Sequence, residues 1–150
     1  MGHLDKVNKL GRTRSHREAM LSNMAVSLFK YRVLKTTEAK AKALRPVVDR
    51  LISTAKKDTL AAKRQVARTV RQKDVFKKLF AEIVPQFEGR ESGFTRVIKL
   101  GVRRGDGAAM SVIELLTEKP KSESDKKDKK GKKTRRPAKK TAPAKEAKAK

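Results

Sequence analysis

The sequence contains no cysteine and no tryptophan, and it has only two histidines. Without cysteine there is no disulfide framework and no cysteine-ligated zinc or iron–sulfur site. The two histidines, His3 and His16, do not have the spacing of a metal-binding pair. We therefore expect no metal ion and no other cofactor, and the absence of cysteine fits a reducing, cytoplasmic location.

Residues that support catalysis are equally scarce. An active site needs a placed base, nucleophile or metal ion. His16 falls at the expected start of a helix, where either an exposed side chain without a role or a phosphate contact fits better than general-base chemistry. The segment Gly105-Asp106-Gly107 lacks the Lys-Ser/Thr ending of a phosphate-binding loop and precedes no helix. The sequence thus predicts a protein that is not an enzyme and has no small-molecule substrate.

Acidic residues are few: 16 Asp and Glu stand against 41 Lys and Arg, for a formal net charge of +25. A strong field of one sign destabilises a compact chain unless a polyanion neutralises it on binding. Nucleic acid is therefore the expected partner. A membrane is not expected, because no segment has the roughly 18 consecutive apolar residues that a transmembrane helix needs.

Aromatic residues number six, five Phe and one Tyr, and most of them have the spacing of core positions. Proteins that bind single strands by base stacking need exposed aromatic side chains. The scarcity of such residues argues against stacking. Binding should instead depend on phosphate and sugar contacts to folded RNA, with specificity from the shape of the RNA.

The composition divides the chain into three parts. Residues 117–150 hold 15 basic and 5 acidic residues and no large apolar residue; such a segment buries too little apolar surface to offset its conformational entropy, so we expect a disordered Lys-rich tail. Residues 1–14 are predicted to form an extended basic arm that binds RNA, although a frayed terminus without a role is the alternative. Residues 15–116 are predicted to form one folded domain with a single core.

Within this domain, the patterns predict an α+β fold. Ser15 and Glu18 have the spacing of a capping box, which predicts a first helix from Ser15. A short strand is expected at 31–36, and Thr36 or Thr37 should cap the next helix. That helix is expected over 38–57, bent at Pro46 but not broken.

The second half of the domain is predicted to contain two shorter helices, a loop and a β-hairpin. The helices are expected at 60–71 and 74–84, the loop at 85–93, and the hairpin strands at 94–102 and 110–116. The expected fold is a small β-sheet, made of one short strand and the C-terminal hairpin, covered by about four helices.

Three clusters of cations on this fold are candidates for phosphate contacts. Arg12, Arg14 and Arg17 surround the start of the first helix, where the helix dipole also favours an anion. The second helix begins with another basic group, Lys40, Lys42 and Arg45. The hairpin carries Arg96, Lys99, Arg103 and Arg104.

Several separated motifs resemble the bacterial large-subunit ribosomal protein L17 family, and they follow one another over residues 1–116. The resemblance rests on residues 13–17, 23–25, 27–28, 35–37, 40–42, 44–45, 51–52, 55–56, 93–97, 104–108 and 113–115. Departures are mild: Gly2 stands where Arg is common, Ser53 where Thr is usual, and Phe94 where Tyr is usual. The tail is unlike the short ends of that family.

The resemblance implies a structural protein that helps to assemble and stabilise large-subunit rRNA near the rim of the peptide exit tunnel, in the bacterial cytoplasm. It also implies contacts with neighbouring large-subunit proteins, ribosomal protein L32 among them. The alternative from composition is a nucleoid or histone-like DNA-binding protein. The candidate rRNA-binding residues are His3, Lys9, Arg12, Arg14, His16, Arg17, Lys40, Lys42, Arg45, Lys56, Arg96, Lys99, Arg103 and Arg104.

Overall fold

The structure is a computed structural model that describes residues 9–117, all of which belong to one unit, Met1–Glu118. Most of the predicted arm and the predicted tail lie outside the described residues. The elements are helix α1 (Arg14–Tyr31), strand β1 (Val33–Thr37), helices α2 (Glu38–Ala55), α3 (Leu60–Thr69) and α4 (Lys73–Lys78), the π-helical turn η1 (Leu79–Ile83), the 3-10 turn η2 (Pro85–Phe87), and strands β2 (Thr95–Val102) and β3 (Ala109–Leu115).

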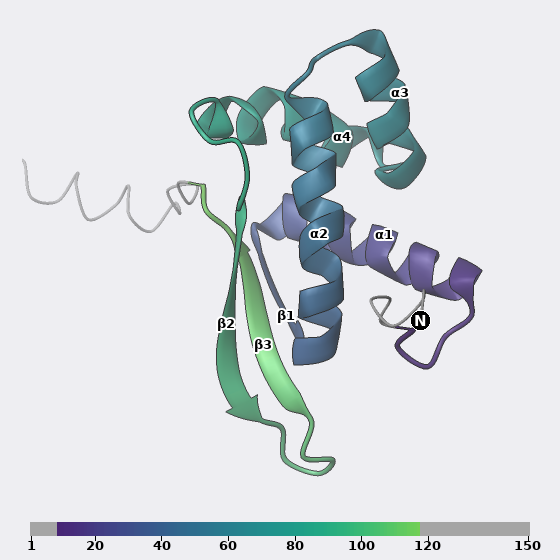
Figure 1. Ribbon diagram of the computed structural model, residues 1–150, viewed down its shortest axis with the longest axis vertical. Helices are drawn as coiled ribbons and strands as arrows, with labels where there is room; N and C mark the ends of the chain where they lie inside the picture. Colours follow the sequence, from purple (N-terminus) through teal and green to yellow (C-terminus); the bar gives the residue numbers. More distant parts are fainter. Residues whose placement is uncertain (1–8, 118–150) are drawn as a thin grey trace, which may run out of the picture. The chain divides into compact units, whose positions relative to one another are not determined.

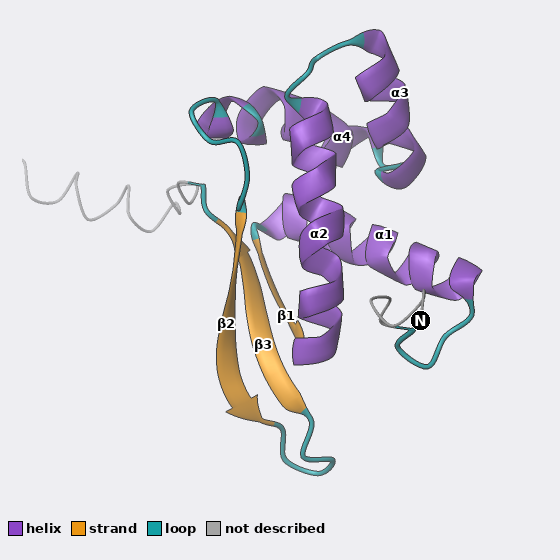
Figure 2. Cartoon of the chain, viewed as in Figure 1, coloured by secondary structure: helices purple, strands orange, loops and turns teal. Residues whose placement is uncertain are grey.

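The three strands form one antiparallel sheet in the order β1-β3-β2 (Figure 2). β2 and β3 are the two arms of the predicted hairpin, and β1 pairs with β3 on its other edge. In the central row, Ile113 of β3 lies between Leu34 and Val97. The predicted α+β class is confirmed, with the first strand beginning at Val33 instead of residue 31.

Helix α2 lies along one face of the sheet and contacts all three strands (Figure 1). α1 crosses α2 and contacts β1 and β3, whereas α3 packs on α2, and α4 packs on α1. The sheet is therefore covered mainly by two helices, and the other two extend the helical layer. The opposite face of the sheet exposes Val33 and Ile98 beside the cations Lys35 and Arg96.

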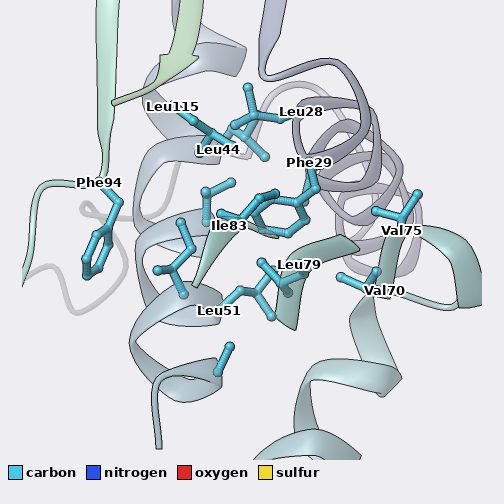
Figure 3. Packing of buried hydrophobic residues seen from close by; sticks show 14 of the residues in the cluster. Leu28, Phe29, Leu44, Leu51, Val70, Val75, Leu79, Ile83, Phe94 and Leu115 are labelled. Carbon is cyan, nitrogen blue, oxygen red and sulfur yellow. The ribbon is translucent and has the colours of Figure 1, made fainter. Parts of the chain in front are cut away.

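The core lies between α2 and the elements that surround it (Figure 3). α2 is apolar at three- and four-residue intervals and therefore buries one continuous side, and it continues through Pro46 as a single helix. The fully buried large side chains of the core are Leu28, Phe29, Leu44, Val48, Ile52, Val66, Leu79, Ile83, Phe94 and Ile113.

The start of α1 differs from the prediction. Thr13, with extended backbone angles, is the N-cap residue, and Ser15 already lies within the helix. The predicted capping box is wrong because Glu18 does not reach back to Ser15. Its carboxylate instead accepts a hydrogen bond from Arg14 Nε at 2.9 Å. One of the arm's predicted cations is therefore the first residue of a helix.

The predicted fourth helix is less regular than expected. α4 keeps α-helical geometry only to Lys78, the next five residues form a π-helical turn, and Pro85 begins a 3-10 turn. The predicted loop 85–93 also contains a core residue: Phe87 is 2 % exposed and packs edge-to-face on Phe94, with ring centroids 5.0 Å apart. This aromatic pair fixes the connection between the helices and β2.

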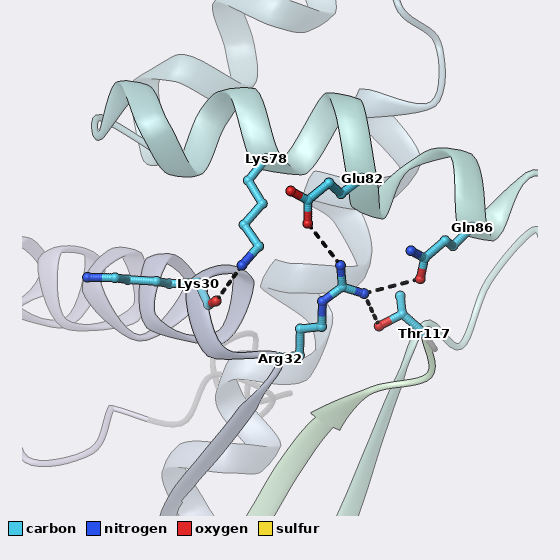
Figure 4. Close-up of polar contacts among 6 residues, drawn as sticks. All are labelled: Lys30, Arg32, Lys78, Glu82, Gln86 and Thr117. Atoms are coloured by element: carbon cyan, nitrogen blue, oxygen red, sulfur yellow. Dashed lines mark hydrogen bonds and ion pairs between the residues drawn. The ribbon is translucent and has the colours of Figure 1, made fainter. Parts of the chain in front are cut away.

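Arg32 is a structural cation that the sequence pattern did not reveal. It ends α1 in the left-handed conformation, with φ of 64°, and is 5 % exposed. Its guanidinium donates to Glu82 at 3.1 Å, to Gln86 at 3.1 Å and to Thr117 at 2.9 Å (Figure 4). One side chain thus joins the end of α1, the irregular turns and the end of β3.

Candidate nucleic-acid interface

The first predicted cluster surrounds the start of α1. Residues 10–12 turn the chain into the helix, and Arg12 Nη1 donates to the Leu10 carbonyl at 2.8 Å. Arg14 is paired with Glu18, but both side chains are largely exposed, at 86 % and 65 %. Exposed pairs of this kind contribute little free energy, so Arg14 can exchange its carboxylate for a phosphate at low cost.

The rest of this cluster is open to a ligand. His16 is exposed in the first turn of α1, and Arg17 is half-buried. Neither has a carboxylate partner in the part of the chain that the structure describes, and the same is true of exposed Lys9. His3 lies outside the described residues. The start of α1 therefore combines free cations with the helix N-terminus.

The second and third predicted clusters meet at one place. Glu38, the first residue of α2, lies 2.8 Å from Lys42 Nζ and 3.7 Å from Lys99 Nζ of β2. The hydrogen bond from Lys42 lowers the pKa of Glu38, and Lys99 lowers it further. One carboxylate thus holds two predicted cations together, and Lys40 is half-buried in the same turn of α2.

At the hairpin tip, a carboxylate organises the turn. Asp106 accepts two hydrogen bonds from Arg103, at 3.0 Å and 2.5 Å, and one from the Ala108 backbone at 3.3 Å. Gly105 and Gly107 have φ of 101° and 62°, a region that glycine adopts without strain. Arg104 is left exposed, with no carboxylate partner in residues 9–117. The tip therefore presents Arg104 on a fixed turn.

The hairpin pair predicts a specific pH dependence. The hydrogen bonds from Arg103 lower the pKa of Asp106 to about 2. Because the folded pKa lies below the ordinary Asp value of about 4, any stabilisation from this pair is present above that value and is lost as the pH falls through about 2. An NMR titration should give an Asp106 midpoint near 2, and Arg103→Ala should move it upward; an ordinary midpoint in the unmodified chain would contradict the pairing.

Two further predicted cations are also paired. Arg96 lies 3.3 Å from Glu114 across the hairpin, with its side chain 60 % exposed. Arg45 lies 4.0 Å from Asp49, whose pKa is raised by burial and lowered less strongly by Arg45. These contacts reduce the local positive charge without hiding the arginines from solvent.

Lys56 has a different role from the other candidates. Its Nζ donates to the backbone carbonyls of Arg90 at 2.6 Å and Glu88 at 3.3 Å, and it lies 5.9 Å from the centre of the Phe94 ring. It lies beyond the last residue of α2, whereas Lys40 and Lys42 lie at the start of that helix. Lys56 therefore ties the loop before β2 to the end of α2.

The structure thus places the predicted residues in two separate regions, and Lys56 belongs to neither of them. The first region is the start of α1, and the second combines the start of α2 with the hairpin. Figure 1 shows the start of α1 well apart from the hairpin tip. Two separated basic regions suit an extended, shaped polyanion better than a compact anionic ligand.

Some basic residues were missed by the sequence prediction. Lys35 of β1 lines a small depression of about 260 Å³ together with Arg103 and Arg104 of the hairpin. Between Asp58 and Asp74 the sequence has no acidic residue, and its cations there are Lys63, Arg64, Arg68, Arg71 and Lys73. That run without acids was a visible signal, but the prediction did not use it.

Other kinds of site were also sought in residues 9–117. No group of three or more His, Asp or Glu side chains there has an arrangement that could hold a metal ion. None of the helices in this range is long and apolar enough to cross a membrane. Fold and charge together define a small, strongly basic α+β protein with two regions of exposed cations.

Comparison with known proteins identifies the family. The family model described as Ribosomal protein L17 matches residues 20–116. The large ribosomal subunit protein bL17 of Desulforapulum autotrophicum is 48 % identical over 118 residues, which cover 79 % of this chain and 98 % of that protein. The large ribosomal subunit protein bL17 of Geobacter metallireducens is 44 % identical over 144 residues, which cover 96 % of this chain and 79 % of that protein. The chain belongs to the ribosomal protein L17 family.

Proposed function

We propose that this protein is a structural, non-catalytic component of the large ribosomal subunit that binds and stabilises large-subunit rRNA. Its place of action is the ribosome in the bacterial cytoplasm. The observation that carries the proposal is membership of the ribosomal protein L17 family, whose relatives are named as large-subunit proteins. The charge supports it, because residues 1–116 alone carry 26 basic against 11 acidic residues.

The mode of binding follows from the ion pairs. The carboxylates that neutralise Arg14, Lys42, Lys99, Arg96 and Arg103 hold side chains that are more than half exposed. A phosphate that replaces such a carboxylate forms a charge-assisted hydrogen bond and releases condensed counterions from the RNA. Recognition therefore depends on whether phosphates of the folded RNA match the spacing of the two regions.

Neighbouring large-subunit proteins are proposed as further contacts, and ribosomal protein L32 is one of them. The face of the sheet that α2 does not cover supplies an apolar surface for such a contact. Val33 and Ile98 are 39 % and 42 % exposed there, and Leu100 and Val102 near the hairpin tip are 51 % and 75 % exposed. Isolated exposed apolar residues are common, but a contiguous group marks an interaction surface, and Ile98, Leu100 and Val102 follow one another along β2.

A competition experiment tests the proposed RNA partner. Labelled large-subunit rRNA bound to the full chain is challenged with unlabelled rRNA or with duplex DNA of equal nucleotide concentration. We expect rRNA to compete at least about tenfold better at physiological salt, because shape contacts add to the non-specific phosphate term. Equal or better competition by duplex DNA would favour a nucleoid or histone-like function instead.

The C-terminal segment gives a separate prediction. Residues 118–150 carry 15 basic and 5 acidic residues, for a net charge of +10. Their deletion should weaken rRNA binding at low salt and reduce its dependence on salt concentration, because fewer counterions are released. Thr117 must be kept, since it accepts a hydrogen bond from Arg32. Footprinting should show the same preferred rRNA site with and without the segment; a changed site would contradict a non-specific role.

A further inference from the structure

A groove between α1 and the connection from α3 to α4 belongs to neither of the two basic regions. Its volume is about 800 Å³, which is within the range of sites for small organic ligands. The wall from α3 is held against α1 by a hydrogen bond from Ser22 Oγ to the Thr69 carbonyl, at 2.5 Å. Figure 1 shows the end of α3 beside the first half of α1.

The lining of the groove is chemically divided. Its apolar part consists of Leu21 and Val26 of α1 and Val47 of α2, all half-buried. The polar part includes the exposed amide side chains of Asn23 and Gln72. An apolar surface next to amide donors and acceptors suits a ligand that has both a flat apolar face and polar edges.

Two exposed arginines, Arg68 and Arg71, complete the lining. Neither has a carboxylate partner among the residues that the structure describes. Arg64 lies one helical turn before Arg68, and like charges at this spacing destabilise an isolated helix. This cost is offset when an anion lies beside the arginines.

The groove is also lined by an acidic residue, Glu18 of α1. Its carboxylate is already paired with Arg14 Nε at 2.9 Å. Because Arg14 neutralises Glu18, the charge that the groove offers to an anionic ligand is that of Arg68 and Arg71.

We propose that this groove binds one unpaired nucleotide of the RNA. The phosphate lies on Arg68 and Arg71, the sugar or base covers Leu21 and Val26, and Asn23 bonds the base edge. A base within a duplex is not accessible in this way, because its faces are stacked and its edges are paired. The inference rests on the proposed function and adds a specific contact to the two phosphate-binding regions.

Site-directed cleavage tests the position of the RNA. The chain has no cysteine, so Ala19→Cys, at an exposed position that lines the groove, introduces a single attachment point for an iron–EDTA hydroxyl-radical probe. Lys57→Cys, in the turn after α2, is the control. With full-length large-subunit rRNA, the probe at residue 19 should cleave one short unpaired segment, and the control should cleave elsewhere. Cleavage confined to duplex, or no cleavage near the groove, would overturn the proposal.

An affinity measurement tests the arginines. Arg68→Ala/Arg71→Ala should weaken rRNA binding at least about tenfold and reduce the salt slope by about 0.7, the value for one neutralised phosphate of a single strand. The control Arg50→Ala/Lys57→Ala removes the same charge from exposed positions. It should weaken rRNA binding by less than about threefold. Equal effects of the two variants would overturn the proposal.

The remaining outcomes separate the inference from the proposed function. Unchanged rRNA affinity of Arg68→Ala/Arg71→Ala, combined with poor incorporation into the subunit, would mean that a protein segment occupies the groove. Failure of the unmodified chain to bind rRNA would contradict the proposed function itself. Urea unfolding of each variant verifies that the fold is retained.

Discussion

Replacing Arg32 with Ala is expected to lower the free energy of unfolding by about 2–3 kcal/mol, because charged hydrogen bonds to three partners are lost. The side chain is only 6 % exposed, whereas its partner Glu82 is 54 % exposed. Glu82 is rehydrated when the Arg32 side chain is removed. The decrease in the free energy of unfolding should therefore remain below that for breaking a fully buried ion pair. Urea unfolding of the full chain measures the difference, and Lys30→Ala, at an exposed neighbour, should change it by less than about 0.5 kcal/mol.

Arg32→Gly separates the effect of the lost hydrogen bonds on the free energy of unfolding from the effect of the backbone conformation. Arg32 has φ of 64°, and glycine at this position removes about 1 kcal/mol of strain relative to alanine. The Gly variant should therefore be more stable than the Ala variant and still less stable than the unmodified chain. If the Gly variant is more stable than the unmodified chain by the full ~1 kcal/mol of relieved strain, the contacts in Figure 4 do not contribute to stability.

Replacing Arg12, Arg14 and Arg17 with Ala is expected to weaken rRNA binding by about 3 kcal/mol, or about 100-fold, at about 1 kcal/mol for each charge-assisted contact. These residues surround the start of α1, where the helix dipole adds to their attraction for phosphate. Arg14 should contribute least, since it already has Glu18 as a partner at 2.9 Å.

The matched control is Arg50→Ala/Lys57→Ala/Lys77→Ala, which removes three exposed cations from other parts of the fold. Filter binding at fixed ionic strength compares the two triple variants. The control should lose only the non-specific part of the affinity. If both variants lose the same affinity, the start of α1 is not an anchor and the charge acts only through its total amount.

The elements that were predicted well depend on local patterns. The apolar period of α2 and the turn residues between β2 and β3 determine those elements from neighbouring positions. The turns after α4 were not predicted, because Phe87 is buried by its contact with Phe94 of another segment. Such contacts depend on the tertiary fold and leave no short-range pattern.

The candidate site shows the same division. The basic regions were visible as sequence clusters, and their carboxylate partners at three- or four-residue spacing were visible as well, although the prediction did not use them. The pairs formed across the sheet and between elements were not visible. Lys42 and Lys99 are far apart in sequence and share Glu38 only in the folded chain. Lys56 remains a predicted RNA contact, and its hydrogen bonds to the carbonyls of Glu88 and Arg90, more than 30 residues away, could not be predicted from the sequence.

The central claim is that this chain is an integral rRNA-bound component of the large ribosomal subunit. Sucrose-gradient fractionation of a lysate, with detection of the full chain before and after a high-salt wash, tests it most directly. We expect the chain to remain in the large-subunit fraction through the wash, because shape-specific contacts persist when non-specific phosphate binding is screened. Sedimentation with chromosomal DNA, or release into the free protein fraction, would contradict the claim.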